Sequence, residues 1–392
     1  MRRIDLRKVQ AANPHTIRDI NRQIVLNYVR EREPISRATI ARETALQRST
    51  ISEIIEVLTG EGLVEEIGEG ESTGGRRPTL LRLRTVGAVA IGVNITPTNT
   101  TIATSDLAGV VLQQSAFPTD SVPERTINKI IEVIRQFSDQ SSIEGVGVSI
   151  PGLVNPEAGN IVFVPYFKWR DVPIADAISK ATGLPVTIDN DANAVALAEL
   201  WFGRPEVRNA RDFIFVLVAD GIGTGIIFDG QVYRGERGAA GEFGHMIVGS
   251  NAPVPCSCGN DDCWEAFASE RAAKARYQRM GGVSLRDFAS LVDRSIAGER
   301  NAKSALTETA RYLGIGISNL IVGFSPEVVV VGGAITRAWP LIENALTQKI
   351  ERSVRRGLPS ARILRSTLNG DPTLMGALSL VLTSKFAGAA AA

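Results

Sequence analysis

Cysteine and histidine are scarce in this sequence. Its 392 residues include only 3 Cys and 2 His. All the cysteines lie in one segment, Cys256 to Cys263, and one of the histidines, His245, lies shortly before it. Such a clustering of scarce Cys and His residues favours a metal site over a disulfide framework.

Long apolar segments are also missing. Met1–Gln10 is charged and lacks the apolar centre of a secretory signal peptide. No apolar run approaches the length that is needed to span a membrane. We therefore expect a soluble, cytoplasmic protein that has no membrane partner.

The length and the charge set the first limits on organisation. A chain of 392 residues exceeds the usual size of one hydrophobic core, so two or three domains are expected. Residues 1–84 hold 15 Lys and Arg against 12 Asp and Glu, a net +3, and the remainder holds 28 against 30, a net −2. This small excess does not by itself establish nucleic-acid binding.

The segment around the cysteines contains a candidate zinc site. The expected ligands are His245, Cys256, Cys258 and Cys263. Three thiolates and an imidazole complete a tetrahedral Zn²⁺ shell and leave no position for a catalytic water, so the site is expected to be structural. It would fix a loop in which Glu242, His245 and Glu265 converge. The alternative is three ordinary buried thiols and a core histidine.

The first 60 residues have the periodicity of three helices. The first helix follows Asn13-Pro14, and its expected inner face is Ile17, Ile20, Ile24, Tyr28 and Val29. Ser36 is the expected N-cap of a short helix over 37–44. A third helix is expected over 48–59, with an inner face of Ile51, Ile54, Ile55 and Leu58.

Two expected strands, 63–67 and 79–83, follow the third helix and enclose a glycine-rich segment. This order of elements is that of a winged helix-turn-helix domain, in which the third helix enters the major groove by its N-terminal end. The residues expected to contact DNA are Arg37, Arg48, Ser49, Thr50 and Ser52 in the helices and Arg76 and Arg77 in the wing. The alternative is a three-helix interaction module with a solvated basic face.

Strands alternate with helices in the rest of the chain, which indicates an α/β fold. Two strand–turn–strand units, at 86–105 and 213–228, each begin one α/β half and predict an internal duplication with a cleft between the halves. The expected divisions are 1–84 for the DNA-binding domain and linker, 85–193 with the C-terminal helix 373–386 for the first lobe, 194–372 for the second lobe with the zinc site, and 387–392 for a disordered tail.

The segment Gly241-Glu242-Phe243-Gly244-His245, followed by Cys256, Cys258, Gly259, Cys263 and Glu265, resembles the signature of the ROK family of repressors, open reading frames and sugar kinases. The resemblance extends from about Val86 to the end of the chain. With a winged helix in front, the sequence is similar to the regulator branch, of the xylose-repressor and N-acetylglucosamine-repressor type. Asp262 stands where the family usually has glycine, and this leaves the ligands intact.

The resemblance implies a two-lobed, actin-like and hexokinase-like fold, a duplicated ribonuclease H-like architecture, with a sugar in its cleft. By the family's pattern the sugar-binding residues would be Gly152, Asn190, Asp191, Glu242, His245 and Glu265. His245 would place one ring nitrogen on zinc and the other on the sugar. Asp191 corresponds to the general base of the kinases and would be vestigial here. The alternative for Asn190 and Asp191 is a turn or a helix cap.

The resemblance also implies that the phosphate-binding turns of the kinases are degenerate. Asn94 replaces an aspartate after the first strand, and Pro97 removes a backbone donor. In the second turn Asp220 stands where the kinases tend to have threonine, and its carboxylate would repel a triphosphate. Tyr166 replaces a common asparagine, and Gly332-Gly333 is either a relic or a tight packing turn.

We therefore expect a regulator rather than an enzyme: a sugar-responsive DNA-binding protein that represses genes of carbohydrate use, such as those of xylose metabolism. Its expected partners are operator DNA, a sugar or sugar-phosphate effector, and further copies of itself in a homodimer or homotetramer. Two alternatives stay open. One is an active ATP-dependent sugar kinase with a fused DNA-binding domain, and the other is a DNA-binding scaffold that a protein partner regulates.

Overall fold

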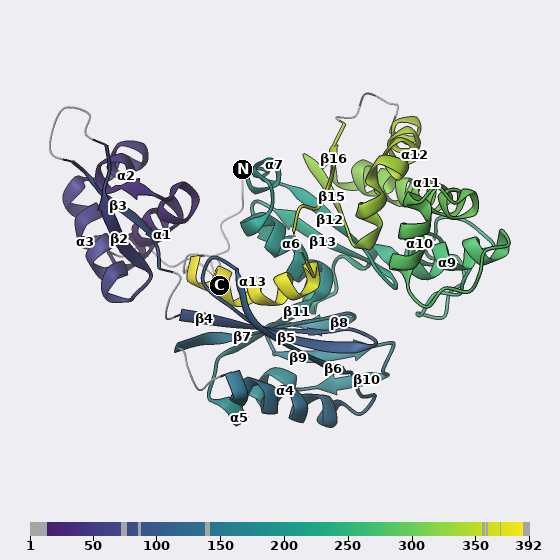
Figure 1. The fold of residues 1–392 in the computed structure, drawn as a ribbon, viewed down its shortest axis with the longest axis horizontal. Helices are drawn as coiled ribbons and strands as arrows, with labels where there is room; N and C mark the ends of the chain where they lie inside the picture. Colours follow the sequence, from purple (N-terminus) through teal and green to yellow (C-terminus); the bar gives the residue numbers. More distant parts are fainter. Residues whose placement is uncertain are drawn as a thin grey trace.

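An N-terminal module and a larger body with two lobes make up the computed structural model (Figure 1). It describes residues 14–71, 77–84, 88–137, 142–354, 357, 360–368 and 370–386. Two predictions, Arg76 in the wing and the tail 387–392, lie outside these residues. Within them, no helix combines the length and the apolar content that crossing a bilayer requires.

The N-terminal module has the predicted order of elements with one addition. Its elements are α1 (Pro14–Arg32), β1 (Ile35–Ser36), α2 (Arg37–Thr44), α3 (Arg48–Gly60), β2 (Val64–Glu69) and β3 (Thr79–Leu83). The strands form a sheet in the order β1-β3-β2. Ser36 caps α2 as predicted, because its hydroxyl accepts from the Thr39 N–H at 3.2 Å. Strand β1 was not predicted, since two residues are too few to show a strand periodicity.

The predicted inner face of α1 is wrong for its first half. Ile17, Ile20 and Ile24 are exposed by 51%, 43% and 36%. The buried side chains are Val25 and Leu26, which were not predicted, and Val29, which was. Apolar residues occupy two adjacent stripes of this helix, so periodicity alone could not decide which stripe packs, and the stripe that packs is rotated by one residue, about 100°.

The first lobe is built on a five-stranded sheet. Its strands are β4 (Ala88–Ile95), β5 (Asn99–Ser105), β6 (Val111–Pro118), β7 (Ser142–Ile150) and β11 (Val186–Asn190). Helices α4 (Pro123–Phe137) and α5 (Ile174–Thr182) cover one face. Helix α13 (Pro372–Phe386) lies on the other, where a Cβ on Gly147 would stand 1.9 Å from the Ala377 carbonyl oxygen. A small sheet of β8 (Leu153–Asn155), β9 (Asn160–Val164) and β10 (Trp169–Val172) completes the lobe.

The second lobe repeats this topology. Its strands are β12 (Phe213–Val218), β13 (Ile222–Phe228), β14 (Gln231–Val232), β15 (Val328–Gly332) and β16 (Arg362–Arg365). Numbered along the chain within each sheet, both sheets have the strand order 3-2-1-4-5. In both, the first three strands are antiparallel and the last two are parallel to the first. This repeat supports the predicted duplication, while the division of lobes at residue 193 stays a prediction.

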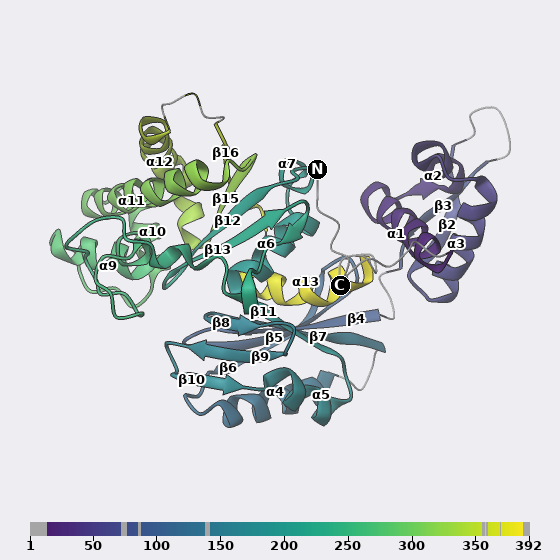
Figure 2. The same cartoon turned by 180° about the vertical axis from the view of Figure 1, so that it is seen from behind.

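Helices and short turns join these strands. They are α6 (Asp191–Phe202), α7 (Pro205–Arg208), η1 (Glu236–Gly238), η2 (Glu242–His245), α8 (Trp264–Ala268), α9 (Glu270–Arg279), α10 (Phe288–Ile296), α11 (Arg300–Phe324), η3 (Ala334–Ala338) and α12 (Trp339–Ser353). Helix α6 lies between the two sheets beside α13 (Figure 2). A Cβ on Gly225 of β13 would stand 2.4 Å from the Ala192 oxygen, and one on Gly376 of α13 would stand 2.9 Å from the Ala194 carbonyl carbon. Glycine therefore lets α6 pack closely on both lobes.

Candidate functional site

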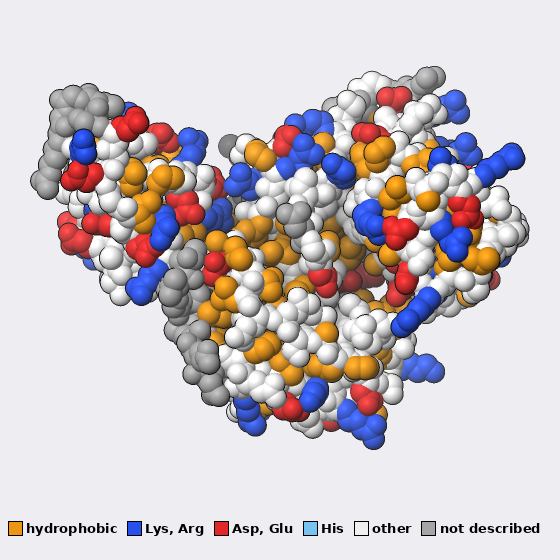
Figure 3. All heavy atoms as spheres, in the orientation of Figure 1, with side chains coloured by type: hydrophobic (Ala, Val, Ile, Leu, Met, Phe, Trp, Pro, Cys, Tyr) orange, Lys and Arg blue, Asp and Glu red, His pale blue; other side chains and the backbone are white. Residues whose placement is uncertain are grey.

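A cleft of about 240 Å³ opens where the two lobes meet. Its walls include all six predicted sugar-binding residues, Gly152, Asn190, Asp191, Glu242, His245 and Glu265. They also include three residues of the turns that we expected to be degenerate phosphate turns, Asn94, Pro97 and Asp220. Acidic side chains gather at this junction in the space-filling view (Figure 3). The fold thus brings together side chains that are far apart in the sequence.

The turn η2, which carries Glu242 and His245, lies directly on strand β13. A Cβ on Gly244 would stand 2.1 Å from the Ile222 oxygen, and one on Gly241 would stand 2.6 Å from the Thr224 oxygen. Gly241 also has a φ of 92°, which favours glycine. The two glycines of the motif therefore allow the turn to pack against the strand, which places Glu242 and His245 at the cleft.

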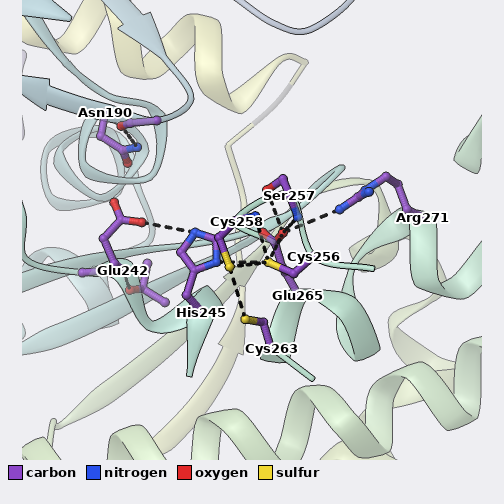
Figure 4. A network of polar contacts seen from close by, with 12 residues as sticks. Asn190, Glu242, His245, Cys256, Ser257, Cys258, Cys263, Glu265 and Arg271 are labelled. Atoms are coloured by element: carbon purple, nitrogen blue, oxygen red, sulfur yellow. Dashed lines mark hydrogen bonds and ion pairs between the residues drawn. The ribbon is translucent and has the colours of Figure 1, made fainter. Parts of the chain in front are cut away.

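The four predicted zinc ligands converge (Figure 4). Their ligand atoms all lie within 4.8 Å of one another. His245 Nδ1 is 3.3 Å from Cys256 Sγ, which is 3.2 Å from Cys258 Sγ, and Cys258 Sγ is 3.6 Å from Cys263 Sγ. A tetrahedral zinc shell separates neighbouring N and S donors by roughly 3.5–3.8 Å. The donor set and its spacing therefore fit Zn²⁺.

The two ring nitrogens of His245 face different neighbours. Nδ1 faces the thiol cluster, whereas Nε2 lies 3.6 Å from Glu242 Oε2. Burial raises the pKa of the Glu242 carboxyl. This arrangement leaves one nitrogen for a metal and directs the other toward the cleft, in line with the expected double role of this histidine.

Glu265 connects the cysteine loop to the cleft. Its Oε1 accepts from the Ser257 N–H at 3.2 Å and from the Ser257 hydroxyl at 3.0 Å, and it lies 3.0 Å from Cys256 Sγ. Its Oε2 lies on the other side, where a Cβ on Gly221 would meet it at 2.6 Å. One oxygen of Glu265 therefore holds the loop, and the other faces the turn between β12 and β13.

Asn190 is the N-cap of α6, so the alternative of a helix cap holds for its carbonyl. Asn190 Oδ1 accepts from the N–H groups of Ala192 and Asn193, at 2.9 and 3.4 Å. Its Nδ2 donates to the Gly152 oxygen at 3.0 Å. Burial raises the pKa of the neighbouring Asp191 to about 6, although a backbone hydrogen bond from Ala192 opposes this.

An ion pair that the sequence analysis missed ties together two walls of the cleft. Both Nε and Nη2 of Arg234 lie 2.8 Å from Asp189 Oδ2, and Asp189 is only 2% exposed. Asp189 Oδ1 accepts from the N–H of Asn190 and the amide of Asn193. Arg234 lies in the segment that leads to Glu242. The two partners are 45 residues apart, so no local pattern could have revealed the pair.

The residues of the two expected phosphate turns make contacts within the protein. Asn94 Nδ2 donates to Thr373 Oγ1 at 2.7 Å and to Asp371 Oδ2 at 3.2 Å, so this amide holds the start of α13. The Asp220 carbonyl accepts from Arg271 Nε at 2.9 Å. A Cβ on Gly333 would stand 1.9 Å from the Val218 oxygen, which identifies Gly332-Gly333 as a tight packing turn. Burial raises the pKa of Glu270 to about 7 and also raises the pKa of Tyr166.

The model of the ROK family matches residues 90–384. The chain belongs to the ROK family. It is 33% identical over 374 residues to the xylose repressor of Bacillus subtilis, covering 93% of this chain and 96% of that protein. Among solved structures it is similar to a ROK family transcriptional regulator, a homologue of the Escherichia coli MLC protein, with a TM-score of 0.80 and 26% identity over 95% of this chain and 97% of that one.

A kinase covers a smaller share of this ROK protein. The ROK glucokinase of Streptomyces griseus, solved with glucose and AMPPNP, superposes with a TM-score of 0.68 at 29% identity. It covers 74% of this chain but 98% of its own. The two regulatory relatives, in contrast, extend over nearly the whole chain.

The N-terminal module of this ROK protein presents the start of α3 to solvent. Arg48 and Ser49 are exposed, whereas Thr50 and Ser52 are half-buried. The first turn of α3 contains no acidic residue. The Ser52 hydroxyl donates to the Arg48 oxygen at 3.0 Å. This helix start therefore remains a candidate for base and phosphate contacts.

The other candidate DNA contacts differ in their surroundings. Arg37 is ion-paired with Glu66 of β2 at 2.7 Å, so a phosphate would have to displace a carboxylate. Arg77 is exposed just before β3. The helix candidates thus include one side chain, Arg37, whose charge is already neutralised.

Proposed function

We propose that this ROK protein is a sugar-responsive DNA-binding transcriptional regulator, a cytoplasmic repressor of genes for carbohydrate use. One observation carries the proposal. A module with the exposed helix start Arg48–Ser49 and a cleft that gathers six candidate sugar contacts occur in one chain. The similarity to a protein named xylose repressor, over 96% of its length, supports it.

Kinase activity is the alternative, and the contacts in the cleft argue against it. Asn94 holds α13, and Asp220 places a carboxylate at the second phosphate turn. Pro97 offers no N–H to a phosphate. Asp191, whose pKa is about 6, retains the chemistry of a general base, so an assay rather than its presence separates the two functions.

The metal has a structural role in this proposal. His245, Cys256, Cys258 and Cys263 would hold Zn²⁺, and with four protein ligands no position remains for a reacting water. When bound, the ion would fix the loop between His245 and Glu265. Both residues line the cleft, so this loop contributes to the shape of the sugar site.

Assembly is part of the proposal as well. One winged helix offers few base contacts, and operators are commonly read by symmetric dimers over two half-sites about one helical turn apart. We propose that the body of the protein forms a homodimer or homotetramer that sets the distance between two α3 helices.

Two assays test the function. The first is a thermal-shift panel of sugars on the purified full-length protein without any partner, in which at least one sugar should raise the melting temperature. The second is ADP release with that sugar and ATP, which should stay at background. Sugar-dependent ADP release that disappears in Asp191→Ala would establish the kinase instead, and a failure of every sugar to bind would favour regulation by a protein partner.

A further inference from the structure

The cleft is lined by negative charge. Five carboxyl side chains line it, namely Asp191, Asp220, Glu242, Glu265 and Glu270. Among the described residues that line it, no Lys or Arg occurs, and His245 is the one basic side chain. Carboxylates accept hydrogen bonds from sugar hydroxyls, whereas they repel a phosphate ester, which carries about −1.5 to −2 charges at pH 7.

Two arginines close to these walls already face oxygen atoms. Arg271 donates through Nε to the Asp220 oxygen at 2.9 Å, and its Nη2 lies 3.6 Å from Glu265 but is buried without a hydrogen-bond partner among the described residues. Arg234 is bound to Asp189 through two nitrogens. A phosphate group would have to compete with Glu265 for Arg271 or break the pair with Asp189 to gain Arg234.

Helices α6, α9 and α13 begin at the cleft, and the N-termini of helices often bind anions through free N–H groups. Here all three are capped by side chains. In α6, Asn190 and Asp191 accept from the N–H of Ala192 at 2.9 and 2.8 Å. In α9, the Ser269 hydroxyl accepts from the N–H of Ala272 at 3.3 Å. In α13, Asp371 Oδ1 accepts from the N–H groups of Thr373 and Leu374 at 3.0 and 3.1 Å. None of these termini therefore offers the phosphate these donors.

We infer that the effector is a monosaccharide without a phosphate group. This inference rests on the proposed function and decides between the sugar and the sugar phosphate that the sequence left open. The volume of about 240 Å³ agrees with it, because it lies below the range of roughly 300–1,000 Å³ for small-molecule sites and so favours a small ligand.

The test is calorimetric titration of the full-length protein with matched pairs: D-glucose and glucose 6-phosphate, N-acetyl-D-glucosamine and its 6-phosphate, and D-xylose and xylose 5-phosphate. We expect one free sugar to bind and its phosphate ester to bind about 100-fold more weakly or worse. A phosphate ester that binds as tightly as its parent sugar overturns the inference and leaves the proposed function standing. If no compound binds, both fail.

Charge-neutral variants test the cause. At pH 8, where Glu270 with its pKa of about 7 is ionised, the ratio of the two affinities should fall by at least about tenfold in Asp220→Asn/Glu270→Gln, because two carboxylates no longer repel the ester. Glu132→Gln on α4, an exposed partner of Lys129 outside the cleft, removes one charge elsewhere and should leave the ratio unchanged. An unchanged ratio in the double variant contradicts the electrostatic explanation.

Two helices, α6 and α13, lead from the cleft to the DNA-binding module. Helix α6 begins with Asp191 in the cleft and ends at Phe202, next to Trp201. The guanidinium of Arg30 in α1 lies 4.4 Å from the centroid of the Trp201 ring. Helix α13 also begins at the cleft, with Thr373. Further along this helix, Leu378, Val381 and Leu382 belong to the same buried cluster as the core side chains of the module.

We propose that α6 transmits sugar binding to the DNA-binding module through the contact of Trp201 with Arg30. A helix moves as a rigid element, and Gly225 of β13 and Gly376 of α13 let α6 pack closely against both neighbours. A displacement of Asn190 and Asp191 by the sugar therefore reaches Trp201. The sugar shifts the module only to the extent that it binds the two arrangements with different affinity.

The measurement is the ratio of operator affinity without and with sugar. Trp201→Ala and Arg30→Ala should each reduce this ratio by at least about fivefold while both proteins still bind the sugar. Arg32→Ala, in the same helix but paired with Glu43 of the module, is the control and should keep the ratio. A ratio unchanged in both variants refutes this route. Trp201→Phe keeps a ring under Arg30 and should restore most of the sugar-dependent change in operator affinity, which provides a second variant if Trp201→Ala folds poorly.

Discussion

The ion pair between Asp189 and Arg234 should control sugar affinity, because it joins the wall that carries Asn190 and Asp191 to the segment that leads to Glu242. Removing one partner of a buried, hydrogen-bonded charge pair costs about 2–5 kcal/mol. Asp189 is 2% exposed, but it keeps two hydrogen bonds at Oδ1, and Arg234 is 37% exposed. We therefore expect the low end, about 2 kcal/mol, which sets the upper limit for the loss of sugar affinity in Arg234→Gln at roughly 30-fold.

A double-mutant cycle measures this value. Sugar affinity is determined by titration calorimetry for the wild type, Arg234→Gln, Asp189→Asn and the double variant. The neutral amide that Asp189→Asn introduces needs no cation, so Arg234→Gln should cost much less in that background, and the coupling energy should be about 2 kcal/mol. A coupling energy below about 0.5 kcal/mol would refute the view that this pair holds the two walls of the cleft together.

Four further predictions follow from the site and the module. The protein should contain about one zinc ion per chain by elemental analysis, and Cys258→Ser should lose both the metal and the sugar response. A zinc content well under half an equivalent per chain, in protein never exposed to a chelator, contradicts this. Sugar-dependent ADP release should stay at background, and a rate above that of Asp191→Ala contradicts it. The carboxyl of Asp191 keeps its proton up to about pH 6 in the folded chain but only up to about pH 3.8 in the unfolded chain, so its contribution to stability declines as the pH rises between these values. Asp191→Asn should therefore raise the melting temperature more at pH 7.5 than at pH 4.5, and equal increases at both pH values contradict this. Arg48→Ala should weaken operator binding at fixed salt and leave sugar affinity nearly unchanged, and a parallel loss of both would mean that the residue is structural.

Local patterns in the sequence were sufficient to predict most of the elements. Ser36 before a short helix is a cap signal that depends on neighbouring residues only, and the structure has that cap. The buried strand β15 and the glycine turn after it were likewise visible as an apolar run followed by Gly332-Gly333. The face of α1 was not predictable, because Ile24, Val25 and Leu26 offer apolar surface on more than one side.

The candidate site shows the same division between local and long-range information. The convergence of the His and Cys side chains was predictable because they lie between His245 and Cys263, in one segment of rare residue types. The partners of Asn94 at Asp371 and Thr373 were not, since nearly the whole body of the protein separates them in sequence. Asn190 was expected to bind sugar, and the structure adds that its carbonyl caps α6, which the local sequence allowed as an alternative.

The central claim is that the cleft controls DNA binding, and operator titration with Glu242→Ala tests it most directly. Glu242 lines the cleft beside His245 and lies far along the chain from the residues of α3. The variant and the wild type are titrated with operator DNA at one salt concentration, with and without the sugar that the thermal-shift panel identifies. We predict that Glu242→Ala binds the operator as tightly as the wild type and is no longer released by the sugar. A variant that the sugar still releases as readily as the wild type would show that the effector site lies elsewhere.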